Sequence, residues 1–445
     1  MSNSALGSLA FFLFATLISA HFLGNLFVKF RQPKVIGEIL AGVLMGPSLC
    51  GHFWQLVESS SASASSSSLP TPLELCYWIG LLLLMFFSGA ETQHLFGRND
   101  NREITLLALL GTGLPFIIAL GFASLVNLRP LAGASSGHAS LTLVIGIAVA
   151  VTSIPVISRI FHDLGILHTR FARLVLGVAV IEDIALWAVL AIATALAKSS
   201  ASGGVLPVGQ ISREIFTTLV FFALGLTLIP RLMRRFHKAR WNSLGSASPA
   251  AYLLILLFAY VAVAAALNVS LVFAAFLAGF AVPKPSGTSE SDHAFCEALK
   301  SVKTVSFSIF IPLYFALVGY KIDWSKSFSL TMLLGFLAAA CLIKLASVTM
   351  GAYAAGFRGL DAVNLAVATN ARGGPGIVLA SVAFDAQIIS PAFYTTLILV
   401  AVFTSQAAGA WLEYVLRKGW PLLSGSLEAT APEHVLEPVP VQRAA

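Results

Sequence analysis

The sequence predicts an all-α polytopic membrane protein with about thirteen transmembrane helices. Of its 445 residues, 57% are hydrophobic and only 11% are charged, and the mean hydropathy is +0.87. A water-soluble protein cannot bury that much apolar surface. Apolar runs of about 20 residues, long enough to cross a bilayer as helices, follow one another along the chain. Two of these runs contain helix-breaking residues at their centres, which predicts two broken helices.

The apolar runs define the predicted spans in order. The first run, 6–28, follows no charged residue and is too long for a signal-peptide core, so we expect an uncleaved first span. The further runs lie near 33–50, 73–93, 104–128, 140–161, 171–197, 213–233, 249–267, 269–283, 304–320, 328–356, 361–384 and 392–416. The serine-rich segment 59–68 is typical of a flexible loop, and 424–445 is typical of a disordered cytoplasmic tail. Residues 1–423 are therefore predicted to form one transmembrane domain.

The basic residues predict the orientation of the chain. With the N-terminus outside, the inner loops and the tail hold 20 Lys and Arg residues, whereas the outer loops hold 5. Because positive residues accumulate on the cytoplasmic side, we expect an outer N-terminus and a cytoplasmic C-terminus. The net charge of +7 is spread over these short loops and therefore indicates no nucleic-acid partner. Lys344 and Arg372 are exceptions, because both lie inside apolar runs.

An acidic pair lies in the middle of the run 171–197. Glu182 and Asp183 are adjacent in VAVIEDIALW, where each ionised acid costs about 2.5–3.5 kcal/mol. Burial disfavours their charge and the two carboxylates repel each other, so the pair can bind either a proton or a cation. Adjacent side chains on a helix point about 100° apart, so one carboxylate is enough to bind the ion directly. We predict that Asp183 binds it, and that the only metal bound is a monovalent cation.

The two broken runs supply oxygen atoms at the same depth. The first break contains Thr152, Ser153 and Pro155, and the second contains Arg372, Gly373, Gly374 and Pro375. Non-helical backbone survives at membrane depth only where protein or water satisfies it. The breaks are seven spans apart, so the two runs cross the membrane in opposite directions, as in an inverted repeat. Hydroxyls and freed carbonyls from the breaks are ligands that suit a hard cation such as Na⁺.

Seven motifs resemble those of one known family. They are RQPKVIGEILAGVLMGP (31–47), LLLLMFFSGAE (81–91), TSIPVISRI (152–160), the VIEDIA core, LVFAAFLAGFAVP (271–283), PLYFALVGYKID (312–323) and NARGGPGIVLAS (370–381). In this order they resemble the second branch of the monovalent cation:proton antiporter superfamily, over residues 30–420. The resemblance implies an inverted-repeat antiporter fold. It places core helices at 104–197 and 328–416, and scaffold helices that form a homodimer at 5–93 and 213–320.

The resemblance also implies roles for individual residues. Asp183 matches the near-constant cation ligand of the family, and Glu182 stands where the family has Asp, Asn or Gln. The glutamate leaves open both the stoichiometry and the choice of ion. Lys344 matches the mid-membrane lysine of the family and is the predicted charge partner of the acids. Arg372 and Gly373 match its RG motif, and Arg372 is expected to support helix ends.

The predicted function is secondary antiport of Na⁺ or Li⁺ against protons across a bacterial inner membrane, by alternating access. Potassium/proton exchange is the alternative, and a channel or a non-transporting sensor on the same fold is less favoured. Thr152 and Ser153 are expected to join the acids at the site, and Glu38 is a candidate for an ion-access funnel. Adjacent acids cannot form an aspartyl-protease dyad, which disfavours an enzyme. The cysteines lack ligand spacing, so no cofactor is predicted.

Overall fold

The structure, a computed structural model, describes residues 3–29, 33–46, 71–95, 101–201, 208–237, 247–283, 290–322 and 327–424. Over these ranges the chain is helical, and the only β contact is an isolated bridge between Ala132 and Ile389. The all-α prediction is therefore confirmed. The predicted loop 59–68 and the predicted tail beyond residue 424 lie outside the described residues.

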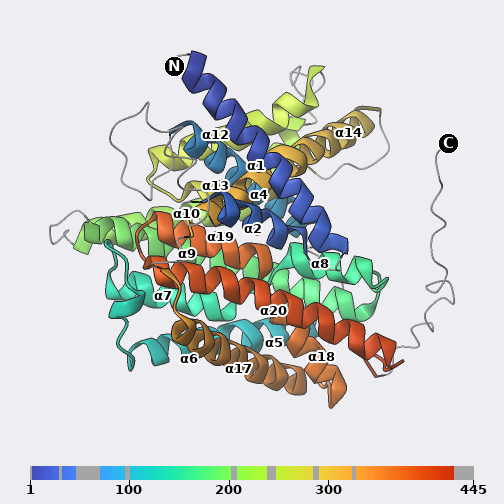
Figure 1. Ribbon diagram of the computed structural model, residues 1–445. Helices are drawn as coiled ribbons and strands as arrows, with labels where there is room; N and C mark the ends of the chain where they lie inside the picture. The colour runs from blue at the N-terminus through green and yellow to red at the C-terminus, as the bar shows by residue number, and fades with distance from the viewer. Residues whose placement is uncertain are drawn as a thin grey trace.

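The helices follow the apolar runs of the sequence (Figure 1). The first half contains α1 (Asn3–Lys29), α2 (Lys34–Met45), α4 (Thr71–Leu95), α5 (Asn101–Ala108), the π-helical turn η1 (Leu109–Gly113), α6 (Leu114–Ala123), the 3₁₀ turn η2 (Arg129–Leu131), α7 (His138–Ala150), α8 (Ile154–Asp163) and α9 (Arg170–Ala201). The second half contains α10 (Val208–His237), α12 (Pro249–Ala266), α13 (Leu271–Phe280), α14 (Glu290–Val305), the π-helical turn η3 (Ser306–Phe310), α15 (Ile311–Tyr320), α17 (Leu330–Ala354), α18 (Leu360–Thr369), α19 (Gly373–Asp385) and α20 (Pro391–Arg417).

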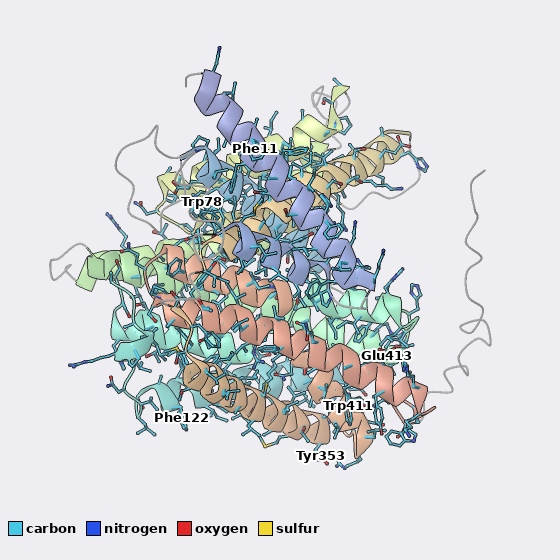
Figure 2. The ribbon with its side chains drawn as sticks, viewed as in Figure 1. Phe11, Trp78, Phe122, Tyr353, Trp411 and Glu413 are labelled. Atoms are coloured by element: carbon cyan, nitrogen blue, oxygen red, sulfur yellow. The ribbon has the colours of Figure 1, made fainter. Side chains whose placement is uncertain are left out.

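Each of the predicted spans corresponds to a helix or to an interrupted pair of helices in the structure. Ten helical segments among the described residues are long and apolar enough to cross a membrane. The other predicted spans fold as α2 with 12 residues, α13 with 10 residues, and the interrupted pair of α18 and α19. Large apolar side chains such as Phe11 and Phe122 are more than half exposed at the periphery (Figure 2). The protein is therefore a multi-pass membrane protein with large apolar side chains exposed on its outer surface.

The helices pack as two groups, seen in the upper and lower parts of Figure 1. In the first group, α1, α2, α4, α13 and α15 contact one another, with α12 against α13 and α14 against α12. In the second group, α5 to α9 contact α17 to α20. Helix α10 contacts α9 of the second group and α13 of the first. The acidic pair and both breaks belong to the second group.

Glycines allow two helix pairs of the first group to pack backbone to backbone. A Cβ on Gly89 of α4 would overlap the carbonyl of Phe276 in α13, and Gly279 of α13 makes the reciprocal contact with α4. Helices α2 and α15 have the same relation through Gly42 and Gly319. Small residues at such crossings are typical of transmembrane helix pairs. They explain why four of the motifs in the sequence contain a glycine within an apolar run.

Candidate functional site

The two predicted breaks cross each other in the second group. The first separates α7 from α8, and the second separates α18 from α19. The backbone N–H of Ser153 donates to the carbonyl of Ala371 at 2.7 Å, and the Thr152 hydroxyl donates to the carbonyl of Thr369 at 2.5 Å. Each break thus satisfies polar groups of the other, as backbone at membrane depth requires. The prediction of two broken, crossing helices is confirmed.

Local sequence explains the geometry of the first break. Ser153 has extended backbone and caps α8, where its hydroxyl oxygen accepts a hydrogen bond from the Val156 N–H at 3.4 Å. Pro155 lies in the first turn of α8, where an absent N–H breaks no helical hydrogen bond. Thr152 and Ser153 therefore support the crossing through their hydroxyls. No described hydrogen bond joins either one to Asp183, so their predicted role as ion ligands stays a prediction.

The second break depends on glycine. Gly373 has a φ of +37°, and a Cβ built there would lie 2.7 Å from the Ser153 hydroxyl oxygen. Its N–H donates to the Ser405 hydroxyl at 3.0 Å. Gly374 and Pro375 follow in the first turn of α19, where backbone N–H groups have no partner within the helix. Glycine at 373 therefore lets the two breaks approach each other. Pro375 removes no hydrogen bond of α19, because its position in the first turn would have no partner for an N–H.

Arg372 lies fully buried between the helix ends. Its guanidinium donates to the carbonyls of Ala148 at 3.0 Å and Val149 at 3.1 Å, near the end of α7. It also donates to the carbonyl of Ala340 at 3.1 Å and to the side-chain oxygen of Asn370 at 2.9 Å. The free carbonyls at a helix C-terminus carry partial negative charge, which the guanidinium offsets. The structure thus places the Arg372 guanidinium at the C-terminal end of α7.

The structure brings the mid-membrane charges together. Glu182 of α9 and Lys344 of α17 are both fully buried, with 2.7 Å between the lysine Nζ and Glu182 Oε1. The same Nζ donates to the carbonyl of Ala150, the last residue of α7, at 2.5 Å. A buried ion pair of this kind requires further hydrogen bonds to compensate for lost hydration. Of the two acids, Glu182 is therefore the one that pairs with Lys344 in this conformation.

One residue of the site was not anticipated from the sequence. Thr112, in the π-helical turn η1, donates its hydroxyl to Glu182 Oε1, the oxygen that also receives Lys344. The available signal was the segment LLGTGLPF, in which a threonine, two glycines and a proline interrupt an apolar run. Isolated threonines are common in apolar runs, so this segment alone did not identify Thr112 as a residue of the site.

Asp183 has a different environment from Glu182. Its side chain is buried, and neither carboxylate oxygen accepts a hydrogen bond from any described residue. Glu182 Oε2 is in the same situation. A buried carboxylate is strongly disfavoured unless a proton, a cation or a hydrogen-bond donor satisfies it. The pair therefore consists of one acid bound by two donors and one acid whose carboxylate has no hydrogen-bond donor among the described residues.

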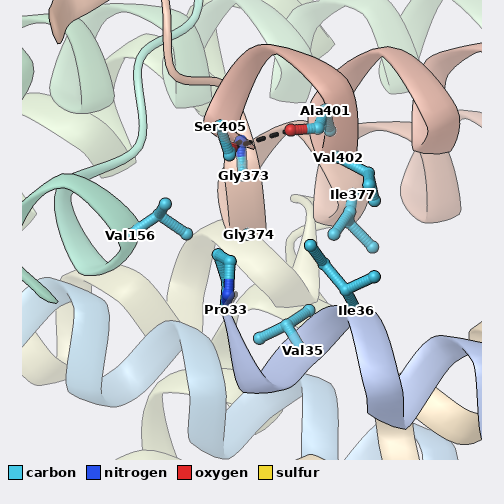
Figure 3. A pocket seen from close by; sticks show the side chains of 10 residues that line it. All are labelled: Pro33, Val35, Ile36, Val156, Gly373, Gly374, Ile377, Ala401, Val402 and Ser405. Atoms are coloured by element: carbon cyan, nitrogen blue, oxygen red, sulfur yellow. Dashed lines mark hydrogen bonds between the residues drawn. The ribbon is translucent and has the colours of Figure 1, made fainter. Parts of the chain in front are cut away.

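Glu38 lies apart from these charges. It is buried in α2, with its Oε1 3.6 Å from Nζ of Lys34, one turn earlier. Figure 3 shows a pocket between the first turn of α2 and the second break. Its lining residues are Pro33, Val35, Ile36, Val156, Gly373, Gly374, Ile377, Ala401, Val402 and Ser405. Helix α2 thus approaches the crossing through apolar side chains, and Glu38 is not among the lining residues.

The motifs and this site can be compared with known proteins. The family model described as "Sodium/hydrogen exchanger, transmembrane" matches residues 12–418. The chain belongs to the sodium/hydrogen exchanger family. This is the family of cation:proton antiporters that the motifs in the sequence predicted.

Several curated relatives of this exchanger are antiporters by name. Na(+)/H(+) antiporter NhaS4 of Synechocystis is 28% identical over 395 residues, covering 87% of this chain and 92% of the relative. Na(+)/H(+)-K(+) antiporter GerN of Bacillus cereus is 26% identical, covering 89% and 94%. K(+)/H(+) antiporter 1 of Saccharomyces cerevisiae is 27% identical, but the chain spans only 43% of its length. The chain likewise spans about half of the plant relatives it matches.

A solved structure supports the fold independently. The sodium proton antiporter MjNhaP1 from Methanocaldococcus jannaschii superimposes with a TM-score of 0.56, at 13% sequence identity. The match covers 93% of this exchanger and 99% of that chain. The predicted antiporter fold is therefore confirmed, and cation/proton exchange is supported by the family and its named relatives.

Proposed function

We propose that this exchanger moves Na⁺ or Li⁺ against protons, and that the two ions compete for Asp183. The buried Asp183 carboxylate, which accepts no hydrogen bond from a described residue, is the observation that carries the proposal. Its neighbour Glu182 is bound to Lys344 and Thr112 and is less free to take a cation. Potassium is the alternative, because the relatives include both Na(+)/H(+) and K(+)/H(+) antiporters. No covalent step or cofactor is required, so we propose no enzymatic activity.

Competition for one carboxylate is sufficient for exchange. A protonated or cation-bound Asp183 is neutralised, whereas the empty anionic form is penalised at membrane depth. Only the two loaded forms then change conformation readily, and this links the movement of the two ions. The hydroxyls of Thr152 and Ser153, at the crossing of the breaks, are the further oxygen ligands we propose. Glu38, on α2 two residues after the pocket residue Ile36, is the proposed access-funnel residue on the first group.

The two helix groups support a division of labour. We assign residues 104–197 and 328–416 to a moving core, and residues 5–93 and 213–320 to a scaffold that dimerises. The core contains both breaks and both charge partners, so movement of this unit would carry the site between the two sides. We place the N-terminus outside and the C-terminus in the cytoplasm of a bacterial inner membrane, as the basic residues indicate.

Asp183→Asn tests the proposal directly. The asparagine keeps the shape of the side chain but cannot be ionised, so cation-driven proton movement should fall to background. Purified protein in liposomes that contain a pH-sensitive dye would be given Na⁺, Li⁺ or K⁺ at neutral and alkaline pH. Glu413→Gln is the control, because Glu413 pairs with Arg417 on α20, away from the breaks. Substantial exchange by Asp183→Asn would move the binding site elsewhere.

A further inference from the structure

The π-helical turn η1 places a hydroxyl against the charged pair. Thr112 is buried, and its hydroxyl donates to Glu182 Oε1. Lys344 Nζ lies 2.7 Å from the same oxygen. Three different helical segments, η1, α9 and α17, therefore meet at one carboxylate oxygen. The other oxygen of Glu182 has no partner among the described residues.

The sequence around Thr112 explains why the turn is π-helical. Pro115 has no N–H, so the carbonyl of Gly111 loses the donor it would have in a regular α-helix. A helix can accommodate that loss with a wider π turn, and such turns are frequent at functional sites. Gly111 also allows close contact with α17, because a Cβ there would lie 3.0 Å from Val348 Cγ2. The turn therefore packs against the helix that carries Lys344.

A tether of this kind has a specific consequence for a glutamate. Glutamate has one more rotatable bond than aspartate, so its carboxylate can reach more positions. Two donors on Oε1 restrict those positions and keep the carboxylate next to Lys344. With Glu182 held there, Lys344 has a partner other than Asp183. Both oxygens of Asp183 are then left for a proton or a cation.

We propose that Thr112 is a positioning residue for cation binding. By holding Glu182 against Lys344, it keeps the lysine from pairing with Asp183, which is the cation ligand under the proposed function. Without the hydroxyl, the Glu182–Lys344 pair loosens and Lys344 competes with the cation for Asp183. Thr112 thus divides an adjacent acidic pair into one acid that binds the lysine and one that binds the ion.

Thr112→Val and Thr112→Ser test this role. The valine has nearly the same shape but no hydroxyl, and the serine keeps the hydroxyl. Hydrogen bonds to charged groups are among the stronger ones, so Thr112→Val should raise the half-saturation concentration for Na⁺ about tenfold or more. The maximal exchange rate should change less, and Thr112→Ser should resemble the wild type. Thr396→Val is the matched control, because the described hydrogen bond of that buried hydroxyl is to the carbonyl of Ala392 within its own helix α20.

A binding measurement separates positioning from a structural role. Stabilisation of the detergent-purified protein by Na⁺ against heat would be compared for Thr112→Val in the wild-type and Glu182→Gln backgrounds. If Thr112 acts through the Glu182 carboxylate, the valine should weaken stabilisation by Na⁺ in the first background and have little further effect in the second. Thr112→Ala removes the same hydroxyl and replaces the valine variant if that one does not fold.

Each outcome decides the proposal. An unchanged half-saturation concentration in Thr112→Val, an equal effect in both backgrounds, or a failure of Thr112→Ser to restore binding would overturn it. Those results would leave the proposed exchange intact as long as the wild type moves protons in response to Na⁺. A wild-type protein that neither binds nor exchanges a monovalent cation would refute the proposed function and this inference with it.

Discussion

At the scale of single residues, the Glu182–Lys344 pair connects ion binding to charge movement. Both side chains are fully buried, and removal of one partner leaves the other charged in a medium where an unpaired charge costs several kcal/mol. If Lys344 releases its proton while a cation is bound at Asp183, each cycle carries more protons than cations. Exchange would move net charge, which the family resemblance leaves open because the first acid is a glutamate.

We therefore expect a membrane potential to drive exchange by the wild type. One net charge moved across 100 mV corresponds to about 2.3 kcal/mol, so the effect should be large. Na⁺-driven proton movement would be measured in liposomes with and without a potassium diffusion potential clamped by valinomycin. Glu182→Gln should become insensitive to the potential or inactive, since Lys344 then lacks its partner. A wild-type rate that ignores the potential would mean that Lys344 keeps its proton throughout the cycle and that exchange moves no net charge.

At the scale of helical elements, the crossing depends on the backbone of Gly373. A residue with a Cβ at a φ of +37° is strained by about 1–2 kcal/mol, and the Cβ would also press on Ser153. Gly373→Ala should therefore lower the unfolding temperature of the purified protein and reduce the exchange rate. Gly374→Ala is a close control, because nothing lies within 4 Å of its added Cβ. Equal effects of the two variants would contradict the close approach of the breaks.

These elements also show what a sequence can and cannot predict. Helix breaks are local, so Pro155 and Gly373 in apolar runs were enough to locate them. The choice of Glu182 over Asp183 as the partner of Lys344 depends on which faces of α9 and α17 meet, and spacing along the chain does not contain that information. The same holds for Thr112, whose orientation follows from a π turn. Its contact with Glu182 joins residues 70 positions apart.

At the scale of the whole molecule, one cluster joins the two helix groups. Lys321, at the end of α15, pairs with Asp385 at the end of α19, with 2.6 Å between Nζ and Oδ1. The Tyr77 hydroxyl of α4 donates to the other oxygen of Asp385 at 2.7 Å. Lys321 Nζ lies 3.8 Å from the centre of the Tyr77 ring. The Tyr394 hydroxyl of α20 donates to the carbonyl of Val318 in α15 at 2.9 Å. Movement of the proposed core against the scaffold must break these contacts.

We expect Lys321→Met to favour the conformation in which this end of the molecule is open. A partly exposed ion pair contributes about 1 kcal/mol, so its loss should raise the population of the open conformation about fivefold. The reporter is a cysteine in place of the buried Val318, in a background where Cys50, Cys76, Cys296 and Cys341 are serine. Its reaction with a membrane-impermeant maleimide should accelerate by the same factor when Lys321 is replaced.

The control for this experiment is a pair of the same kind within one helix group. Lys303 of α14 lies 2.7 Å from Glu91 of α4, and both helices belong to the first group. Lys303→Met removes an ion pair of similar length without separating the core from the scaffold, so the cysteine at 318 should keep its wild-type reactivity. If Lys321→Met and Lys303→Met accelerate labelling equally, the cluster around Asp385 does not control closure. The two groups would then have to be held together by other contacts, such as those of α10 with α9 and α13.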